Sequence, residues 1–362
     1  FPNKTYTQAP GKAVKAEPGK IYACICWSDG DNIQFDQNPI YHLWHDPARG
    51  TIPVATPLAP ALQELNSPLL DWYYSMMTTN DELEAGPSGF QFIYIEYFNN
   101  NVFPDWCNLS RIWCADAGFH NARPWMVRNP SSKYSTYLKT CGFEGVIGDK
   151  WSLEAGVPPV LGDHGSGNEE QLYQQFEAIK PNENRPTFVS FSCESGDFLQ
   201  KSKLGLGYSA IKRQIDRINQ EYPGRYVFLL PKDEFATIRA YYSFTNVPQQ
   251  VSARPDALNG LFPMKNGDGD FRIMERNGQH YWLVPKHNSP NYFYFDVRDD
   301  FLPKAGTAVE IDLGYLDKGS GEIALDYDSS EIRLSNADLL LSDPGAWKRY
   351  AYAVQRMNSG QW

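Results

Sequence analysis

The chain has 362 residues, of which 42% are hydrophobic, and carries a formal net charge of −10 at pH 7. This acidic balance argues against a nucleic acid as partner, because phosphate binding depends on clustered Lys and Arg. No stretch reaches the roughly 18 apolar residues that a membrane-spanning helix requires, so we expect no membrane span. The length favours two domains.

The aromatic content is high, with 10 Trp, 22 Tyr and 20 Phe. Flat aromatic faces stack on sugar rings, and amides and carboxylates bind hydroxyl groups, so the composition suits a carbohydrate-active protein. A large β-containing domain with an aromatic core would have the same composition. Both interpretations remain open at this point.

The first predicted strand is the continuous apolar run over residues 21–28, which ends in Ser28-Asp29-Gly30-Asp31-Asn32. A buried parallel strand has this appearance when it delivers polar groups to the open end of an α/β core. Two acids and an amide around a glycine turn suit acid/base chemistry, ligand binding or a metal. An Asx-type turn that caps the next helix is the plain alternative.

Residues 21–245 alternate between strand and helix patterns, after an N-terminal segment over 1–20. Ile211, Ile215, Ile218 and Tyr222 follow one helix face, and Leu172, Phe176 and Ile179 follow another, with Asn168 as its predicted cap. The predicted strands are 21–28, 52–58, 90–95, 122–127, 143–148, 157–161, 186–193 and 226–231. Eight strands over this length predict a TIM-like (β/α)8 barrel of the α/β class. A doubly wound open sheet also alternates, but it usually has fewer strands.

Residues 246–270 are rich in Pro, Gly, Asn and Asp, and we interpret them as a linker. Short alternating segments follow and predict an antiparallel β-sandwich, resembling a jelly roll, over 271–362. This length is small for a complete jelly roll, so we expect an accessory domain that is incomplete.

Two further segments carry a family resemblance. Residues 80–95 read Asn-Asp-Glu-Leu-Glu-Ala-Gly-Pro-Ser-Gly-Phe-Gln-Phe-Ile-Tyr-Ile, and Pro57-Leu-Ala-Pro-Ala-Leu62 precedes them. With Ser28–Asn32, they make residues 20–245 resemble the GxGYxYP putative glycoside hydrolase family. The resemblance implies a glycan-cleaving hydrolase.

The motif that names this family is only partly kept. Gly89 and Tyr94 match it, whereas Gln91, Phe92 and Ile95 replace its second Gly, its first Tyr and its Pro. A side chain at Gln91 stands where the motif allows close backbone approach. We therefore interpret the chain as a divergent member with a substrate that can differ from that of its relatives.

Glycoside hydrolysis usually needs two carboxyl groups, about 5–5.5 Å apart for retention and about 6.5–9.5 Å apart for inversion. Asp29 and Asp31 are the first catalytic candidates, and Glu194 is the predicted partner from a strand end across the rim. Asp149 and Asp233 follow other predicted strands and are its rivals. Each could instead be an ordinary rim residue in a salt bridge or a cap.

The predicted substrate-binding residues lie at or beside the same strand ends. They are the possible sugar platforms Trp27, Tyr94 and Trp151 and the possible hydroxyl ligands Asn32 and Ser88. Trp and Tyr also fill large cores, and Ser88 could simply complete the turn that Gly86-Pro87 begins.

A metal-dependent polysaccharide deacetylase is a further alternative, because His42, His45 and Asp46 lie near the paired Asp in sequence. A helix on the outside of a barrel would direct these side chains away from the rim, so we predict no metal and no cofactor. The loop Asn266–Asp270 lacks a Glu at EF-hand spacing, so we expect a solvated turn there.

Six cysteines without a C-x-x-C pattern predict mainly buried free thiols. Two sequons, at Asn3 and Asn108, make export plausible, and we expect a secreted, extracellular or periplasmic protein. The leading hypothesis is a hydrolase that cleaves a poly- or oligosaccharide at the carboxyl-terminal rim of the barrel. The other is a non-catalytic carbohydrate-binding protein on a degenerate hydrolase barrel.

Overall fold

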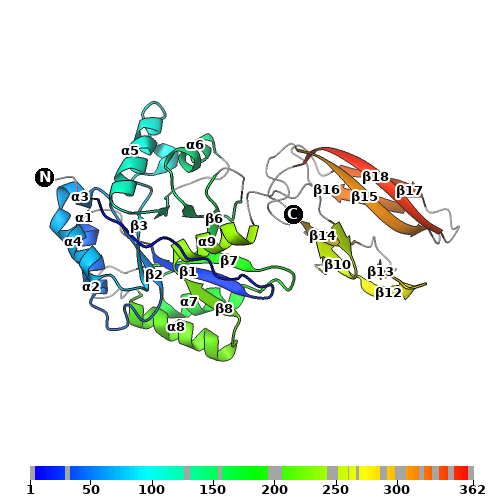
Figure 1. Ribbon diagram of the computed structural model, residues 1–362, viewed down its shortest axis with the longest axis horizontal. Coiled ribbons are helices and arrows are strands. Elements are labelled where there is room, and N and C mark those ends of the chain that lie inside the picture. Colours follow the sequence, from blue (N-terminus) through cyan, green and yellow to red (C-terminus); the bar gives the residue numbers. More distant parts are fainter. Residues whose placement is uncertain are drawn as a thin grey trace. The chain divides into compact units, whose positions relative to one another are not determined.

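The computed structural model divides the chain into two compact units, Phe1–Ser243 and Phe244–Trp362. Figure 1 labels the helices and strands of both units. The structure describes residues 5–28, 33–125, 131–153, 157–194, 206–242, 252–259, 261–265, 269–285, 292–297, 307–317, 322–327, 334–340 and 346–357.

The first unit is a parallel barrel of the α/β class. Seven strands form a closed ring in chain order, because β1 pairs with β7 on one edge and, through Cys26 and Ala55, with β2 on the other. The ring strands are β1 (Ile21–Trp27), β2 (Val54–Leu58), β3 (Asp81–Ala85), β4 (Asn121–Ala122), β5 (Gly145–Gly148), β6 (Val160–Ser166) and β7 (Thr187–Cys193). The predicted barrel is therefore confirmed, but not its eight-stranded ring.

The eighth strand explains this difference. β8 (Tyr226–Leu229) has four residues and pairs only with Ile21–Cys24, the first part of β1. The end of β1 stays available to β2, and the ring closes without β8. α9 (Pro231–Tyr242) follows, and its Phe235 ring lies where a side chain on Gly145, the first residue of β5, would be.

Helical segments follow most of the strands and surround the ring (Figure 1). They are α1 (Ile33–Phe35), a π-helical turn (Asp36–Ile40), α2 (Tyr41–Leu43), α3 (Leu62–Leu65), α4 (Ser67–Met76), a 3-10 turn (Ile95–Tyr97), α5 (Phe103–Asp116), α6 (Ser132–Thr140), α7 (Glu169–Ala178), α8 (Tyr208–Glu221) and α9. Asn168 caps α7 by accepting a hydrogen bond from the Gln171 N–H, which confirms the predicted cap. Ile211, Ile215 and Ile218 are buried on α8, as their spacing predicts.

The third strand is not where the sequence pattern predicts it. Residues 90–95 form no strand, and Tyr94 makes only an isolated bridge to Trp125. The strand is the acidic segment Asp81–Ala85, whose five residues are all buried. Gln8, in the N-terminal segment, holds it by exchanging hydrogen bonds with the backbone of Leu83.

In the second unit, the described strands pair antiparallel in twos. The pairs are β9 (Ser252–Arg254) with β10 (Ala257–Asn259), β11 (Leu261–Met264) with β14 (Tyr294–Val297), β12 (Arg272–Arg276) with β13 (Gln279–Leu283), β15 (Thr307–Asp317) with β18 (Ala346–Met357), and β16 (Glu322–Tyr327) with β17 (Leu334–Leu340). Three of these strands lie inside the predicted linker, so that interpretation of residues 246–270 is wrong. Turn residues there separate short strands.

Candidate functional site

An ion pair lies inside the barrel, near the carboxyl ends of its strands. The Arg123 Nη2 atom is 2.9 Å from Asp163 Oδ2 and 3.0 Å from Ser192 Oγ. The Nη1 atom of the same guanidinium donates to the carbonyl oxygen of Ser28 at 3.0 Å. Arg123 thus links β6 and β7 to the end of β1, where the Ser-Asp-Gly-Asp-Asn segment begins.

Asp163 is held on both carboxylate oxygens. Ser192 Oγ donates to Oδ2 at 2.7 Å, and Ser190 Oγ donates to Oδ1 at 3.3 Å. The side chains of Arg123 and Asp163 are only 15% and 12% exposed. Burial lowers the pKa of Arg123, but Asp163, Cys26 and Glu84 together outweigh burial and raise that pKa above its ordinary value. The pair is therefore a fixed charged feature of the barrel interior.

Glu84 is the most unusual group near this pair. It is fully buried, and neither of its carboxyl oxygens has a hydrogen-bond partner among the described residues. Burial raises its pKa well above the ordinary value, Glu82 raises it further, and Arg123 lowers it only in part. Burial therefore favours the protonated, neutral form of Glu84.

Two other buried carboxyl groups lie farther from the rim. Glu82 accepts hydrogen bonds from Asn121 Nδ2 at 2.6 Å and from the Lys232 N–H at 2.8 Å, and burial raises its pKa to about 7. Glu234, on α9, accepts from the Val189 N–H, and burial raises its pKa well above the usual range. These contacts fasten α9 to the barrel, so they are structural.

The first catalytic candidates, Asp29 and Asp31, lie outside the described residues, as does Asn32. The described chain ends just before them, at Ser28, whose N–H donates to the Cys193 carbonyl at 2.8 Å. Cys193 is the last residue of β7, and Glu194 follows it.

Glu194 is exposed at the end of β7. Because β7 is the direct neighbour of β1, with Trp27 opposite Cys193, Glu194 does not lie across the rim from β1. That part of the prediction is wrong, for the ring closes after seven strands. Neighbouring strands are about 4.8 Å apart, so the ends of β1 and β7 lie side by side.

The two rival acids are not brought to this place. Asp149 directly follows β5 and is exposed. Asp233 lies in the first turn of α9 and accepts a hydrogen bond from the Lys12 N–H at 2.7 Å. It ties down the N-terminal segment, which gives it a structural partner.

Two predicted substrate-binding residues are enclosed by protein. Trp27 has no exposed surface and packs edge-on against Tyr208, because it points outward from β1 to the helices. Ser88 is buried, donates to the Ile93 carbonyl and accepts from the Trp125 N–H, so its hydroxyl completes a turn. Neither can contact a ligand in this conformation.

The other two aromatic candidates differ from each other. Tyr94 is 41% exposed and lies 6.5 Å from the Trp125 ring, two residues beyond Arg123 in sequence. It remains a candidate platform beside the barrel mouth. Trp151 is half-buried and stacks on Phe188 with an angle of 9° between the rings, so one face of its indole is already occupied.

The histidines of the deacetylase alternative have partners on the outer layer. The His45 ring stacks on Trp72, and Asp46 accepts hydrogen bonds from the N–H and hydroxyl of Ser209 at the start of α8. In the part of the chain that is described, no three or more His, Cys, Asp or Glu side chains gather as a metal site would require. The described cysteines, all six, are buried free thiols, as predicted.

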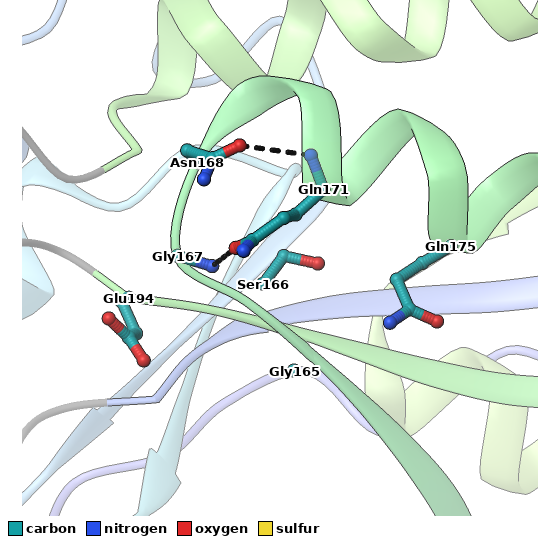
Figure 2. A pocket seen from close by; sticks show the side chains of 7 residues that line it. All are labelled: Gly165, Ser166, Gly167, Asn168, Gln171, Gln175 and Glu194. Carbon is teal, nitrogen blue, oxygen red and sulfur yellow. Dashed lines mark hydrogen bonds between the residues drawn. The ribbon is translucent and has the colours of Figure 1, made fainter.

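An open pocket lies beside Glu194, with a volume of about 610 Å³. The ends of β6 and β7 and the first turns of α7 form it. Figure 2 shows Gln171 and Gln175 reaching into it from α7, with Glu194 on the other side. Gly167 has no side chain, and a Cβ there would lie 3.1 Å from Glu194 Oε2. This glycine leaves room for the carboxylate beside the backbone.

Neither Glu84 nor Arg123 was predicted as a site residue from the sequence. Glu84 lies in a segment with alternating acids, which resembles a solvated loop, and Arg123 directly follows a two-residue strand. Arg123-Pro124-Trp125 lies inside the predicted strand 122–127, whereas the observed strand ends at Ala122, so the place of the arginine at a strand end was not predicted. The long side chain that crosses to Ser28 could not be inferred from the sequence.

Comparison with known proteins bears on this geometry. Residues 19–147 match the sequence model described as the GxGYxYP putative glycoside hydrolase C-terminal domain. The resemblance to this family is confirmed over those residues. The matched region contains β1 to β4, β5 except its last residue, and Arg123, and it is shorter than the predicted range of 20–245. No curated protein matches the chain.

A solved structure described as a putative hydrolase from Bacteroides thetaiotaomicron resembles the chain with a TM-score of 0.55 and 20% sequence identity. The similarity covers 66% of this chain and 49% of that one, so the chain spans about half the length of that relative. At this identity it shows a shared fold.

A structure described as a putative polysaccharide deacetylase from Mycobacterium smegmatis has a TM-score of 0.42 and 10% identity, over 70% of this chain and 99% of that one. That likeness is too weak to carry an argument. Among the described residues, no helix combines the length and the apolar character that crossing a bilayer requires.

Proposed function

We propose that this protein is a glycan-cleaving hydrolase that uses two carboxyl groups from neighbouring strand ends. Glu194, after β7, supplies one group, and Asp29 or Asp31, after β1, supplies the other. The reaction takes place at the carboxyl-terminal mouth of the barrel, where active sites of this fold lie.

The pairing of β1 with β7 carries this proposal. Ser28 donates its N–H to Cys193, and each of these two residues is followed in sequence by a candidate acid. Two carboxyl groups on adjacent strand ends suit the separations of about 5–9.5 Å that glycoside hydrolysis uses.

The Arg123–Asp163 pair also supports the proposal, because it anchors the residue that precedes the acidic segment. Its guanidinium holds the Ser28 carbonyl, so the start of the acidic segment is anchored to two other strands. A site that must keep its carboxyl groups at a set distance benefits from such anchoring. In this scheme Asp163 and Arg123 are positioning residues.

The remaining parts of the proposal concern the setting of the reaction. The exposed Tyr94 ring offers a face for a sugar ring, the second unit acts as an accessory β-sandwich, and the protein works outside the cytoplasm. The family match over residues 19–147 supports a glycan as substrate.

A reducing-sugar screen against a panel of oligosaccharides tests the proposal. We expect wild type to cleave at least one substrate and Glu194→Gln to lose at least about a hundredfold in kcat, because acid/base catalysis contributes on that scale. Asp29→Asn and Asp31→Asn are measured beside it, and one of them should lose as much. Glu170→Gln, which changes an exposed acid of α7, is the matched control and should keep full activity.

Two results would contradict the proposal. Full activity of Glu194→Gln would remove Glu194 from the reaction. Binding of an oligosaccharide by wild type without any cleavage would favour the carbohydrate-binding alternative.

A further inference from the structure

Several polar side-chain groups in the pocket beside Glu194 make no hydrogen bond to another described residue. Gln171 Oε1 accepts from the Gly167 N–H, and Asn168 Oδ1 accepts from the Gln171 N–H, as Figure 2 shows. The amide nitrogens of both side chains make no hydrogen bond to another described residue. The amide of Gln175 and the carboxylate of Glu194 likewise have none.

These unpaired groups include hydrogen-bond donors and hydrogen-bond acceptors. The three amide nitrogens are donors, and Gln175 Oε1 and the Glu194 carboxylate are acceptors. Hydroxyl groups donate and accept at once, so they can use both. A phosphate, sulfate or carboxylate group could use only the donors, and the Glu194 carboxylate would repel it.

The charge of the pocket leads to the same class of ligand. No Lys or Arg is among the described residues that line it, and Glu194 is its one charged side chain there. An anionic sugar would therefore meet a negative charge without a compensating cation. A neutral sugar would meet groups that match its hydroxyls.

A buried hydroxyl gives independent support. Ser166 is 3% exposed and lines the pocket, and its Oγ atom has no hydrogen-bond partner in the described structure. A buried hydroxyl without a hydrogen-bond partner destabilises the fold, because its lost hydration is not replaced. A ligand hydroxyl that reached Ser166 in the pocket would supply the partner.

The pocket also adjoins the ion pair of the barrel. Gly165, in its wall, lies opposite Ser192 on β7, and a Cβ on Gly165 would be 3.6 Å from Ser192 Oγ. Ser192 in turn donates to Asp163. The volume of about 610 Å³ lies within the usual range of roughly 300–1,000 Å³ for small-ligand sites.

We propose that this pocket is a subsite for one neutral sugar ring of the substrate, with Gln171 and Gln175 as its specificity-determining residues. The inference rests on the proposed function, because Glu194 is the candidate acid at the edge of the same pocket. It adds the selection of neutral over acidic glycans.

Isothermal titration with three neutral trisaccharides (cellotriose, maltotriose and mannotriose) and one acidic trisaccharide (trigalacturonate) tests the subsite. We expect at least one neutral probe to bind wild type at millimolar concentration, and trigalacturonate to bind at least about tenfold more weakly. Gln175→Ala should weaken neutral binding about tenfold, which is the scale of one or two lost hydrogen bonds.

Gln174→Ala is the matched control, because Gln174 is the preceding residue of α7 and is exposed, and its side chain donates to Glu170 on the same helix. It should leave binding within twofold of wild type. Alanine is a strong helix former, so both variants should fold.

The inference is overturned if no neutral probe binds, if trigalacturonate binds equally well, or if Gln175→Ala binds like Gln174→Ala. Cleavage of the same probes is measured separately. Binding that depends on Gln175 but is not followed by cleavage would overturn the proposed hydrolase and support the subsite. Cleavage that Gln175→Ala does not change would support the hydrolase and overturn the subsite.

Discussion

The two faces of the barrel strands have opposite chemistry. On β7, Val189, Phe191 and Cys193 belong to the hydrophobic core beneath the helices, while Ser190 and Ser192 point to Asp163 inside the ring. β1 repeats the pattern, with Trp27 packed against Tyr208 outside and Cys26 close to Glu84 and Asp163 inside.

Because of this difference, the outer face of the strands contributes mainly to stability, and the inner face carries the polar groups of the candidate site. The outer face buries apolar surface, which contributes about 25 cal/mol per Å². The inner face instead collects carboxyl, hydroxyl and guanidinium groups, which are costly to bury unless they are paired or neutral. A strand that alternates in this way can hold a reactive site without weakening its own attachment to the helices.

Breaking the ion pair should have the largest effect. Arg123→Met leaves Asp163 as a buried charge without its partner, so we expect the free energy of unfolding at pH 7 to fall by about 3–5 kcal/mol. Denaturation in urea measures this change. The double variant Arg123→Met, Asp163→Leu should recover part of the loss, and a loss below 1 kcal/mol in the single variant would contradict the account.

Glu84 should make stability depend on pH. Its pKa is raised above 4.5 in the fold, so the native state keeps a proton that the unfolded chain releases as pH rises above about 4.5. The stability contributed by the neutral form is full below that pH and declines above it, by about 1.4 kcal/mol per pH unit until the native pKa is reached.

Glu84→Gln removes this titration while keeping the shape of the side chain. The free energy of unfolding of the variant minus that of wild type should be larger at pH 8 than at pH 5. Urea denaturation at both pH values measures this difference. An identical difference at the two pH values would show that Glu84 is not a neutral acid in the fold.

Ser190→Ala should have a small effect. It removes the longer of the two hydroxyl contacts to Asp163, at 3.3 Å, and leaves the one from Ser192. We expect a loss of about 1 kcal/mol in the free energy of unfolding. A loss as large as that of Arg123→Met would mean that the serines, and not the arginine, hold the carboxylate.

The sequence predicted the outer face well and the inner face poorly. The run over 21–28 and the apolar spacing of α8 correspond to β1 and to a buried helix face, because burial against helices leaves a hydrophobic pattern. The strand Asp81–Ala85 was missed, since the same pattern treats Glu82 and Glu84 as solvated. Because the side chains that face the barrel interior are polar, this strand lacks the run of apolar residues by which a buried strand is recognised.

The candidate site was only partly predictable for a related reason. Position after a strand identified Glu194, which lines a pocket. The same rule selected Asp149 and Asp233, because every loop that follows a strand is polar. To tell Glu194 from Asp149 and Asp233, one must know which strand lies beside β1. The ring closes with β7 next to β1 because β8 has only four residues and pairs with the first part of β1.

The separation of the two faces is tested most directly by a matched pair of variants on β7. Ser192→Ala changes the inner face and Val189→Ala the outer one, and both glycan cleavage and the free energy of unfolding are measured for each. We expect Ser192→Ala to lower kcat at least tenfold with a stability loss of about 1 kcal/mol, and Val189→Ala to lose about 2 kcal/mol of stability with kcat unchanged. A loss of kcat in Val189→Ala, with Ser192→Ala fully active, would contradict this separation of the two faces.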